Sequence, residues 1–501
     1  MRNITASKLY DYMQCPHRVW RDIYGPQDEK IKKTNPFVQL LWDRGIVYEK
    51  EVISKSGKLL DLSNGSLEQR FKSTIEAMNK KTPLIYQGVL INDNIVGIPD
   101  LLKLMPDGTY IPVDIKSGAG REGVDENEGE EGKLKKHYAV QLALYVDVLN
   151  KLGFENKKQG LIIDINGNEV IYNLNETIGL KNKMTFWELY EQTFNNVSIL
   201  VNNEDKNKPA LGGICKLCPW YNSCHKWAED NDDLTGLFYL GRSKRDVLEE
   251  DANIHNIQDI LSIDVKELIE LKKEDKNLLK GIGQATIEKI VKRADVLKNI
   301  KKPVLYNKIY LPSVSYELFF DIEDDPTQEF VYLHGIYQRN NGKEKFIDFT
   351  AKNISLEEEK TAWQNFWGYI KFLPKNDFAV YYYSPHEKST YRRMQKKYPD
   401  VISEKELESF FENPNVIDLY GVVLKNTDWP LSSYSIKSLA VYLEFKWRDE
   451  TPSGALSIEW FNKYIETGDK KILKRILLYN EDDCKATMIL KDALYQMNKK
   501  Y

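Results

Sequence analysis

The stretch "IVGIPDLLKLMPDGTYIPVDIKSG" at residues 95–118 sets the fold of the first half of this chain. It contains two apolar, β-rich runs separated by "MPDGT" (105–109), a Pro-Asp-Gly sequence typical of a tight turn. If the turn occupies these five residues, Leu104 pairs with Tyr110. The sequence therefore predicts a β-hairpin in a buried sheet.

The same register concentrates negative charge at the end of this hairpin. It places Asp100 directly opposite Asp114, where like charges about 4.5–5.5 Å apart are destabilising. Lys116 is two residues further on and shares the face of Asp114. Two carboxylates and a lysine at the ends of buried strands are typical of a site for a divalent cation and an attacking water.

Three of the five cysteines of the chain lie within "GGICKLCPWYNSC" at residues 212–224. Their spacing is Cys215-x2-Cys218-x5-Cys224. A chain with so few cysteines is not built on disulfides, and clustered cysteines in such a chain indicate a metal site.

The fourth ligand of that metal site has to come from elsewhere in the chain. Cys15 lies in a helical pattern and is a better candidate than Cys484, because it would join the two ends of one domain. His17 and His225 are further potential ligands of a zinc ion. A [4Fe–4S] cluster also takes four thiolates, and the spacing alone does not choose between the two.

Several short motifs resemble the RecB-like branch of the PD-(D/E)XK nucleases. They are "IPD" followed by "DIK", "GIVYE" (45–49) and "QLALY" (141–145), and the cysteines resemble the iron–sulfur version known in CRISPR-associated RecB-like exonucleases. Tyr48 is a departure, since it stands near the position where relatives often have a metal-binding histidine. The resemblance covers roughly residues 1–230.

This resemblance implies a role for each matching residue. Asp100 and Asp114 would hold Mg²⁺ or Mn²⁺ with Glu49 as a further ligand, and Lys116 would orient or polarise the attacking water. Gln141 and Tyr145 would position the strand. The resemblance also favours a [4Fe–4S] cluster, held by Cys15, Cys215, Cys218 and Cys224.

A second set of acidic residues lies in the last third of the chain. In "YELFFDIEDDP" (316–326) Asp321 and Glu323 are two apart, so both project from one face of a strand. Tyr479 and Asp483 are four apart on a predicted helix and share a face.

The intervening order of elements points to an RNase H-like fold. Residues 329–350 read as two strands joined by an Asn-Asn-Gly turn, and a helix follows. The pattern resembles the DEDDy class of 3′–5′ exonucleases, which implies two metal ions on four carboxylates, with Tyr479 aligning the attacking water. The fourth carboxylate is Glu387 or Asp418, and Glu387 is the first choice.

Residues 231–303 are helical in pattern and connect the two candidate domains. "LLKGIGQATIEKIVKRA" (278–294) resembles a helix-hairpin-helix, in which Gly281 and Gly283 would allow a tight turn that offers N–H groups to a phosphate. A plain structural linker is the alternative. The Gly- and Glu-rich stretch at 118–132 is predicted to be a solvated loop.

The sequence as a whole predicts an α/β multidomain protein. We expect a PD-(D/E)XK restriction-endonuclease-like domain at 1–230, a helical bridge at 231–303 and an RNase H-like domain at 304–501. The net charge of −4 does not by itself indicate a nucleic-acid-binding protein. The absence of a signal peptide and of an apolar run of eighteen residues predicts a cytoplasmic protein outside the membrane.

The expected function is that of a metal-dependent DNA nuclease with two active sites, acting on single strands or free ends. Two alternatives stay open at this point. One is an RNA-processing nuclease. The other is a nucleic-acid-binding protein in which one domain is catalytically degenerate.

Overall fold

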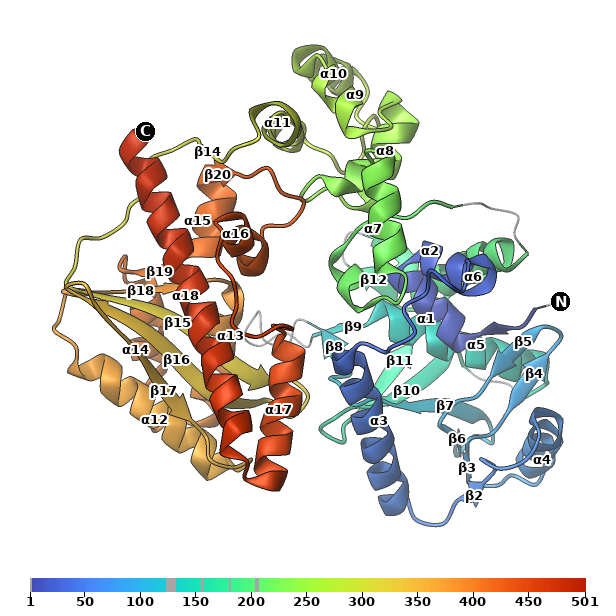
Figure 1. Ribbon diagram of the computed structural model, residues 1–501. Helices are drawn as coiled ribbons and strands as arrows, with labels where there is room; N and C mark the ends of the chain where they lie inside the picture. The colour runs from blue at the N-terminus through green and yellow to red at the C-terminus, as the bar shows by residue number, and fades with distance from the viewer. Residues whose placement is uncertain (1, 123–131, 155–156, 180–181, 203–206) are drawn as a thin grey trace. The chain divides into compact units, whose positions relative to one another are not determined.

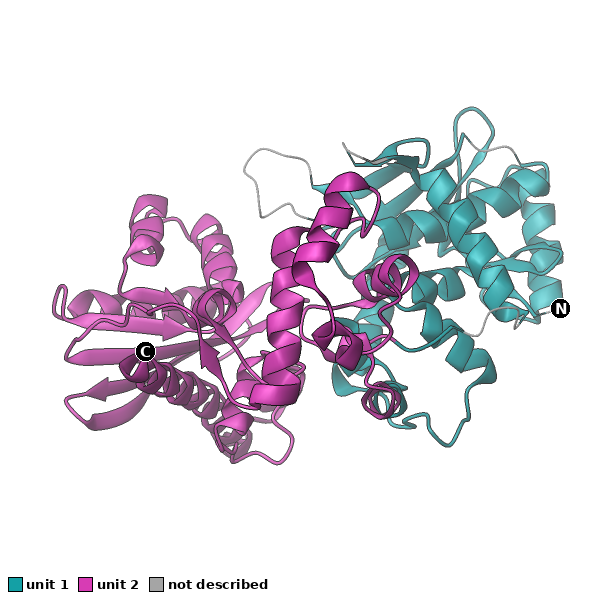
Figure 2. Ribbon diagram, turned by 90° about the horizontal axis from the view of Figure 1, so that it is seen from above, with its two compact units in different colours: residues 1–209, 213–224 teal, residues 210–212, 225–501 magenta. Residues whose placement is uncertain are grey.

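A computed structural model describes the chain except for residues 1, 123–131, 155–156, 180–181 and 203–206 (Figure 1). Most of the Gly- and Glu-rich stretch therefore lies outside the described residues. Two compact units are present, one comprising 1–209 and 213–224 and the other comprising 210–212 and 225–501 (Figure 2). In the described part of the chain, no helix has the length and apolar character needed to cross a membrane.

The first unit is built on a mixed sheet of six strands in the order β11-β10-β7-β6-β3-β2. A separate three-stranded sheet has the strand order β1-β5-β4. The strands are β1 (Ile4–Thr5), β2 (Leu60–Asp61), β3 (Leu84–Tyr86), β4 (Leu90–Asn92), β5 (Ile95–Gly97), β6 (Leu101–Leu104), β7 (Tyr110–Ile115), β10 (Gln159–Ile163) and β11 (Glu169–Asn173). Two short pairs are β8 (Arg121–Glu122) with β9 (Lys133–Leu134), and β12 (Thr177–Gly179) with β13 (Asn182–Thr185).

The predicted hairpin is confirmed in its register. Leu104 pairs with Tyr110 and Leu101 with Val113, and the N–H of Met105 donates to the carbonyl of Thr109 across the turn. Every residue of β7 is buried, because helices cover both faces of the sheet.

The helices of the first unit are α1 (Ala6–Gln14), α2 (Pro16–Tyr24), α3 (Pro36–Lys55), α4 (Leu67–Asn79), α5 (Lys136–Lys151) and α6 (Phe186–Val201), and α7 (Tyr221–Asp230) contains the boundary between the units. Tyr110 packs in the core that α5 helps to form, whereas Val113 packs with Val52 of α3. By alternation along β7, Asp114 faces the side of α5.

The helical pattern around Cys15 is corrected in one detail. Two helices form instead of one, and Cys15 lies between them as the C-cap of α1 and the N-cap of α2. Its φ of −162° and ψ of 111° are extended, because Pro16 disfavours the helical conformation in the residue before it. Cys15 therefore lies at a break between two helices and not inside one.

The predicted helical bridge consists of α8 (Arg242–Ala252), α9 (Ile257–Leu261), α10 (Val265–Glu274) and α11 (Gln284–Asp295), and it groups with the second unit. A buried ion pair joins it to the rest of that unit. The Nε of Arg293 donates to Asp428 at 2.8 Å, and both side chains are about 97% buried. Lys289 also donates to the carbonyl of Leu424.

The second unit contains a five-stranded sheet in the order β17-β16-β15-β18-β19. Its strands are β15 (Tyr316–Asp325), β16 (Phe330–Asn340), β17 (Lys343–Thr350), β18 (Phe378–Tyr382) and β19 (Val416–Asp418), and β14 (Val304–Leu305) pairs with β20 (Thr427–Asp428). The Asn-Asn-Gly turn is confirmed: Asn340 pairs with Lys343, and both Asn341 and Gly342 have positive φ, as in a type I′ turn.

The helices of this unit cover both faces of the sheet (Figure 1). They are α12 (Leu356–Phe372), α13 (Pro385–Lys397), α14 (Glu404–Glu412), α15 (Leu419–Asn426), α16 (Ile436–Tyr442), α17 (Gly454–Thr467) and α18 (Lys470–Lys500). Phe320 packs in the core with α12 and α13, whereas Phe319 packs in the core with α18. Alternation along β15 therefore places Asp321 and Glu323 on one face of the strand, which is the α18 side.

Candidate active sites

The first site lies at the end of the hairpin formed by β6 and β7. The Nζ of Lys116 is 3.0 Å from Asp114 Oδ2, and Asp114 is 3% exposed. Asp100, just before β6, accepts a hydrogen bond of 2.7 Å from the N–H of Ile115. Burial, and then the charge of Asp114, raise the pKa of Asp100 to about 8. The hairpin thus confines two acids that repel one another unless a cation or a proton intervenes.

Gln87 connects Glu49 to this pair of acids, and sequence reasoning missed it. Its side-chain amide donates to Glu49 at 3.1 Å and to Asp100 at 3.2 Å. The carbonyl of Gln87 accepts a hydrogen bond from Arg70, and its N–H donates to the carbonyl of Asp100. Tyr86 also donates to Glu49 at 2.9 Å. Nothing in the sequence around Gln87 marks it as part of a site.

Gln141 and Tyr145 lie on the buried face of α5, which packs against the sheet. The Oε1 atom of Gln141 is buried and has no hydrogen-bond partner among the described residues. The hydroxyl of Tyr145 donates to the carbonyl of Ile98 at 3.5 Å. Its ring packs against Gly97, where an added Cβ would come within 2.7 Å of the ring.

Tyr48 does not join the first site. Its hydroxyl donates to the backbone carbonyl of Asp164, and its ring packs with Val113 and Ile115. The tyrosine found near the position of the relatives' histidine thus has a packing role. Glu49, the next residue, points to Tyr86 and Gln87 instead.

The second site brings three acids into close contact. Ligand atoms of Asp321, Glu323 and Asp483 all lie within 4.8 Å of one another. Among the described residues, no other group of three histidine, cysteine or acidic side chains is as close. Asp321 and Glu323 come from β15 and Asp483 comes from α18. The carboxylates of the first site are not packed as tightly.

Burial and mutual repulsion raise the pKa values of the acids in the second site. Burial, and then Asp483, raise the pKa of Asp321 well above its usual range and that of Glu323 to about 8. Burial also raises the pKa of Asp483, although Lys437 opposes this shift. A divalent cation would relieve the repulsion by replacing the protons.

Asn480 supports two of these acids, and it too was missed from the sequence. Its buried amide donates to Asp321 at 2.7 Å and to Glu323 at 3.4 Å. Gly335 pairs with Asp321 in the sheet, and an added Cβ at Gly335 would lie 1.6 Å from the Asn480 side chain. A glycine inside a strand often marks a site where another group packs closely against the backbone, so Gly335 could have indicated that a side chain packs there.

Tyr479 lies against the same cluster. A hydrogen bond between the side chains of Tyr479 and Asp483 lowers the pKa of Asp483 against the larger effect of burial. Lys437 donates to the Tyr479 hydroxyl at 3.0 Å, and the indole N–H of Trp447 donates to Asp483 at 2.7 Å. Lys437 and Trp447 carry no motif that marked them in the sequence.

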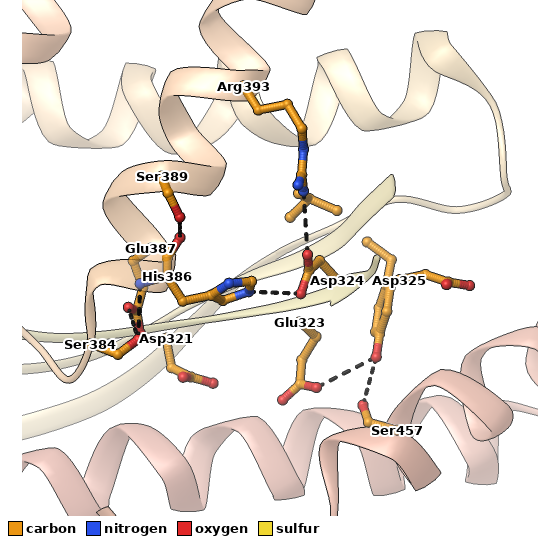
Figure 3. Close-up of polar contacts among 12 residues, drawn as sticks. Asp321, Glu323, Asp324, Asp325, Ser384, His386, Glu387, Ser389, Arg393 and Ser457 are labelled. Carbon is orange, nitrogen blue, oxygen red and sulfur yellow. Dashed lines mark hydrogen bonds and ion pairs between the residues drawn. The ribbon is translucent and has the colours of Figure 1, made fainter. Parts of the chain in front are cut away.

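Glu387 and Asp418 differ in their surroundings. Glu387 is 4% exposed at the start of α13, accepts a hydrogen bond from Ser384 at 2.9 Å and raises the pKa of Asp321 (Figure 3). Burial raises the pKa of Glu387 itself to about 7. Asp418 instead caps α15, where it accepts a hydrogen bond from the N–H of Tyr420. Glu387 is therefore better placed to complete the cluster.

Two of the four candidate cluster ligands, Cys218 and Cys224, are affected by the thiols of the others. Burial is the main cause that raises the pKa of Cys218, and burial with smaller contributions from the Cys15, Cys215 and Cys218 thiols raises the pKa of Cys224 to about 12. All five cysteines of the chain, Cys484 included, lie in described segments, and none of them forms a disulfide. Within these segments, no three thiols lie within 4.8 Å of one another.

Trp220 holds the two cysteine-bearing segments together. It is fully buried, donates from its indole N–H to Asp22 of α2 at 2.9 Å and stacks under the guanidinium of Arg21 at 4.6 Å. Arg21 also donates to Ser223, next to Cys224. These contacts anchor α2, which follows Cys15, on the loop that carries the other three cysteines.

The two histidines considered as ligands have other contacts. Nδ1 of His17 is 2.8 Å from the side-chain oxygen of Asn207, and its ring stacks on Trp20. Nδ1 of His225 lies 3.5 Å from Glu229 on the same helix.

Comparison with protein families agrees with this architecture. Residues 14–225 match the PD-(D/E)XK nuclease superfamily, and residues 318–495 match the RNase_H superfamily. No curated protein and no solved structure gives a match. The chain thus joins a PD-(D/E)XK nuclease domain to an RNase H-like domain, which confirms the predicted resemblance and fold class.

At this level the two domains support a metal-dependent nuclease that binds nucleic acid and hydrolyses phosphodiester bonds. Divalent metal ions are the cofactors that PD-(D/E)XK nucleases use, and the acidic cluster of the second unit has the donors that such ions prefer.

Proposed function

We propose that the chain is a DNA exonuclease with two separate active sites, one in each unit, that acts on single strands or free ends. The observation that carries the proposal is the convergence of Asp321, Glu323 and Asp483 beside the Tyr479 hydroxyl, in a chain that also holds Asp100, Asp114 and Lys116 in another fold. Each set has the oxygen donors for Mg²⁺ or Mn²⁺.

In the first unit, Asp100 and Asp114 would hold the metal ion, with Glu49 as a further ligand oriented by Gln87. Lys116, which already contacts Asp114, would orient or polarise the water. Gln141, whose buried amide oxygen has no hydrogen-bond partner among the described residues, would help to position the substrate strand. Tyr145 would support that positioning from the same helix face.

In the second unit, Asp321, Glu323, Asp483 and Glu387 would hold two metal ions. A metal pair there would stabilise both the attacking and the leaving oxygen of the phosphodiester. Tyr479 would align the attacking water through its hydroxyl. We assign 3′-end trimming to this unit and the opposite polarity to the first unit.

We propose a [4Fe–4S] cluster on Cys15, Cys215, Cys218 and Cys224. The mutual influence of the thiols and the contacts of Trp220 support a shared site. The order and spacing of these four cysteines resemble those of the iron–sulfur version of the RecB-like nucleases, which favours this cluster over a single zinc ion.

The bridge would contribute a phosphate contact. Gly281 has a φ of +84°, and Gly283 is the N-cap of α11, so the first N–H groups of this helix are available to a phosphate. The buried pair of Arg293 and Asp428 fixes this helix on the RNase H-like part of its unit. We therefore assign the contact to strands that enter the second site.

A labelled-strand assay tests the proposed function. Wild-type protein with Mg²⁺ or Mn²⁺ should shorten single-stranded DNA labelled at either end, and EDTA should stop both reactions. Faster degradation of RNA would make RNA the preferred substrate, and equal rates would contradict a preference for DNA. The second candidate is a nucleic-acid clamp in the second unit, favoured by the position of Glu387 outside the tight group of three acids. It would bind strands without trimming them in any metal.

A further inference from the structure

Lys437 is a cation at the second site that has no counterpart among the residues predicted from the sequence. It lies in the first turn of α16 and is partly buried. Its Nζ donates to the hydroxyl of Tyr479 at 3.0 Å and to the carbonyl of Pro452 at 2.8 Å, and it lies 5.0 Å from the centre of the Tyr479 ring. Its position relative to Tyr479 is thus fixed from two sides.

The segment before α16 is also fixed. The hydroxyl of Tyr434 accepts a hydrogen bond from the N–H of Trp429 at 2.7 Å and donates to the carbonyl of Trp429 at 3.0 Å. The Ser435 side chain then caps α16 by accepting from the N–H of Ser438. Lys437 therefore extends to Tyr479 from a rigid base.

Lys437 also acts on the acids themselves. Its charge opposes the burial that raises the pKa of each of Asp321, Glu323 and Asp483. A metal ion in the cluster would experience the same positive charge as a repulsion.

We propose that Lys437 is a positioning residue of the second active site, which occupies the Tyr479 oxygen so that the hydroxyl proton points to the acidic cluster. A tyrosine hydroxyl has one proton to donate, and an ammonium group can only donate. With Lys437 on the oxygen, the proton of Tyr479 is directed to Asp483 or to a water beside it. This inference rests on the proposed trimming activity of the second unit.

A double-mutant cycle on the full chain tests this role. Lys437→Met should lower kcat for 3′-end trimming about tenfold, the loss expected for one hydrogen bond to a charged group, with KM unchanged. At saturating metal concentration, the same change in the Tyr479→Phe background should have no further effect on kcat. Lys437→Arg should restore part of the rate, and the exposed Lys446→Met is the matched control. Equal losses with and without the Tyr479 hydroxyl would overturn the inference.

Mn²⁺ binding provides a readout that does not need activity. In protein carrying Asp114→Asn to weaken the first site, Lys437→Met should tighten Mn²⁺ binding at least about threefold, because a nearby positive charge is removed. Lys446→Met should leave the affinity unchanged. An unchanged affinity in Lys437→Met would overturn the inference. A tightened affinity in a protein that trims no 3′ end would support Lys437 and reject the proposed activity.

Discussion

The two acidic sites gather their carboxylates in different ways. In the first unit, Asp100 and Asp114 belong to one hairpin, so a short stretch of chain is enough to bring them together. In the second unit, Asp321 lies on a strand and Asp483 on the last helix, so the whole domain has to fold before they meet. The second site therefore depends on tertiary packing where the first depends on a local turn.

The sites also differ in how the protein offsets the negative charge. In the first site, Asp114 contacts Lys116 directly, and Asp100 accepts hydrogen bonds from the backbone and from Gln87. In the second site, the three acids crowd one another, and Lys437 contacts Tyr479 instead of a carboxylate. The second unit should consequently rely more on a bound cation for its stability.

The largest expected effect is a loss of metal and stability that is confined to the first unit. Cys15→Ser should abolish iron binding by the proposed cluster and lower the melting temperature of the first unit by about 10 °C, since about 2–4 °C is lost per kcal/mol in a domain of this size. The second unit should keep its 3′-end trimming. Metal analysis and calorimetry on the purified full-length protein measure both.

Cys484→Ser is the matched control for this change. Cys484 is buried in α18 and contacts the carbonyl of Gly335, far in sequence from the other cysteines. The Cys484→Ser protein should have the same iron content as the wild-type protein. Zinc in a one-to-one ratio with the chain, without iron, would contradict the cluster assignment.

The next effect is a pH dependence of the metal-free protein. An unfolded glutamate loses its proton near pH 4.5, whereas folded Glu323 has a pKa of about 8. Between these values the folded state binds more protons, so stability in EDTA should fall as the pH rises from 5.5 to 8.5. Mg²⁺ should therefore raise the melting temperature more at pH 8.5 than at pH 5.5.

Substitutions sharpen this comparison between the sites. Asp321→Asn should flatten the pH dependence more than Asp114→Asn, because the second site holds three crowded acids and Asp114 is already paired with Lys116. A melting temperature in EDTA that rises over the same pH range would show that the acids are not repelling one another.

The smallest expected effect concerns the amide found in each site. Gln87 bridges Glu49 and Asp100, and Asn480 bridges Asp321 and Glu323. Gln87→Met and Asn480→Leu remove the donor at similar volume, and each should slow its own site about tenfold while sparing the other. Steady-state rates on strands labelled at one end measure this, and a loss in both sites from either change would contradict independent sites.

Local sequence patterns predicted the elements and the motif residues. The Pro-Asp-Gly turn gave the register of the first hairpin, and spacings of two and four residues placed Asp321 with Glu323 and Tyr479 with Asp483. These inferences need only the geometry of one strand, one helix or one turn.

The remaining residues could not be predicted because their partners are distant in the chain. Gln87 meets Glu49 only after α3 has packed on the sheet, and Lys437 meets Tyr479 only after α16 has packed on α18. The helix break at Cys15 was predictable in principle, since Pro16 follows it. The domain boundaries stay a prediction.

The most direct test of two independent sites is a single assay with single-stranded DNA carrying different labels at its 5′ and 3′ ends. Asp321→Asn should stop loss of the 3′ label by about 10³-fold or more, as expected when several kcal/mol of metal-dependent stabilisation is lost, and should spare the other end. Asp114→Asn should have the reverse effect. One substitution that stops loss of both labels, or two that stop neither, would contradict the account.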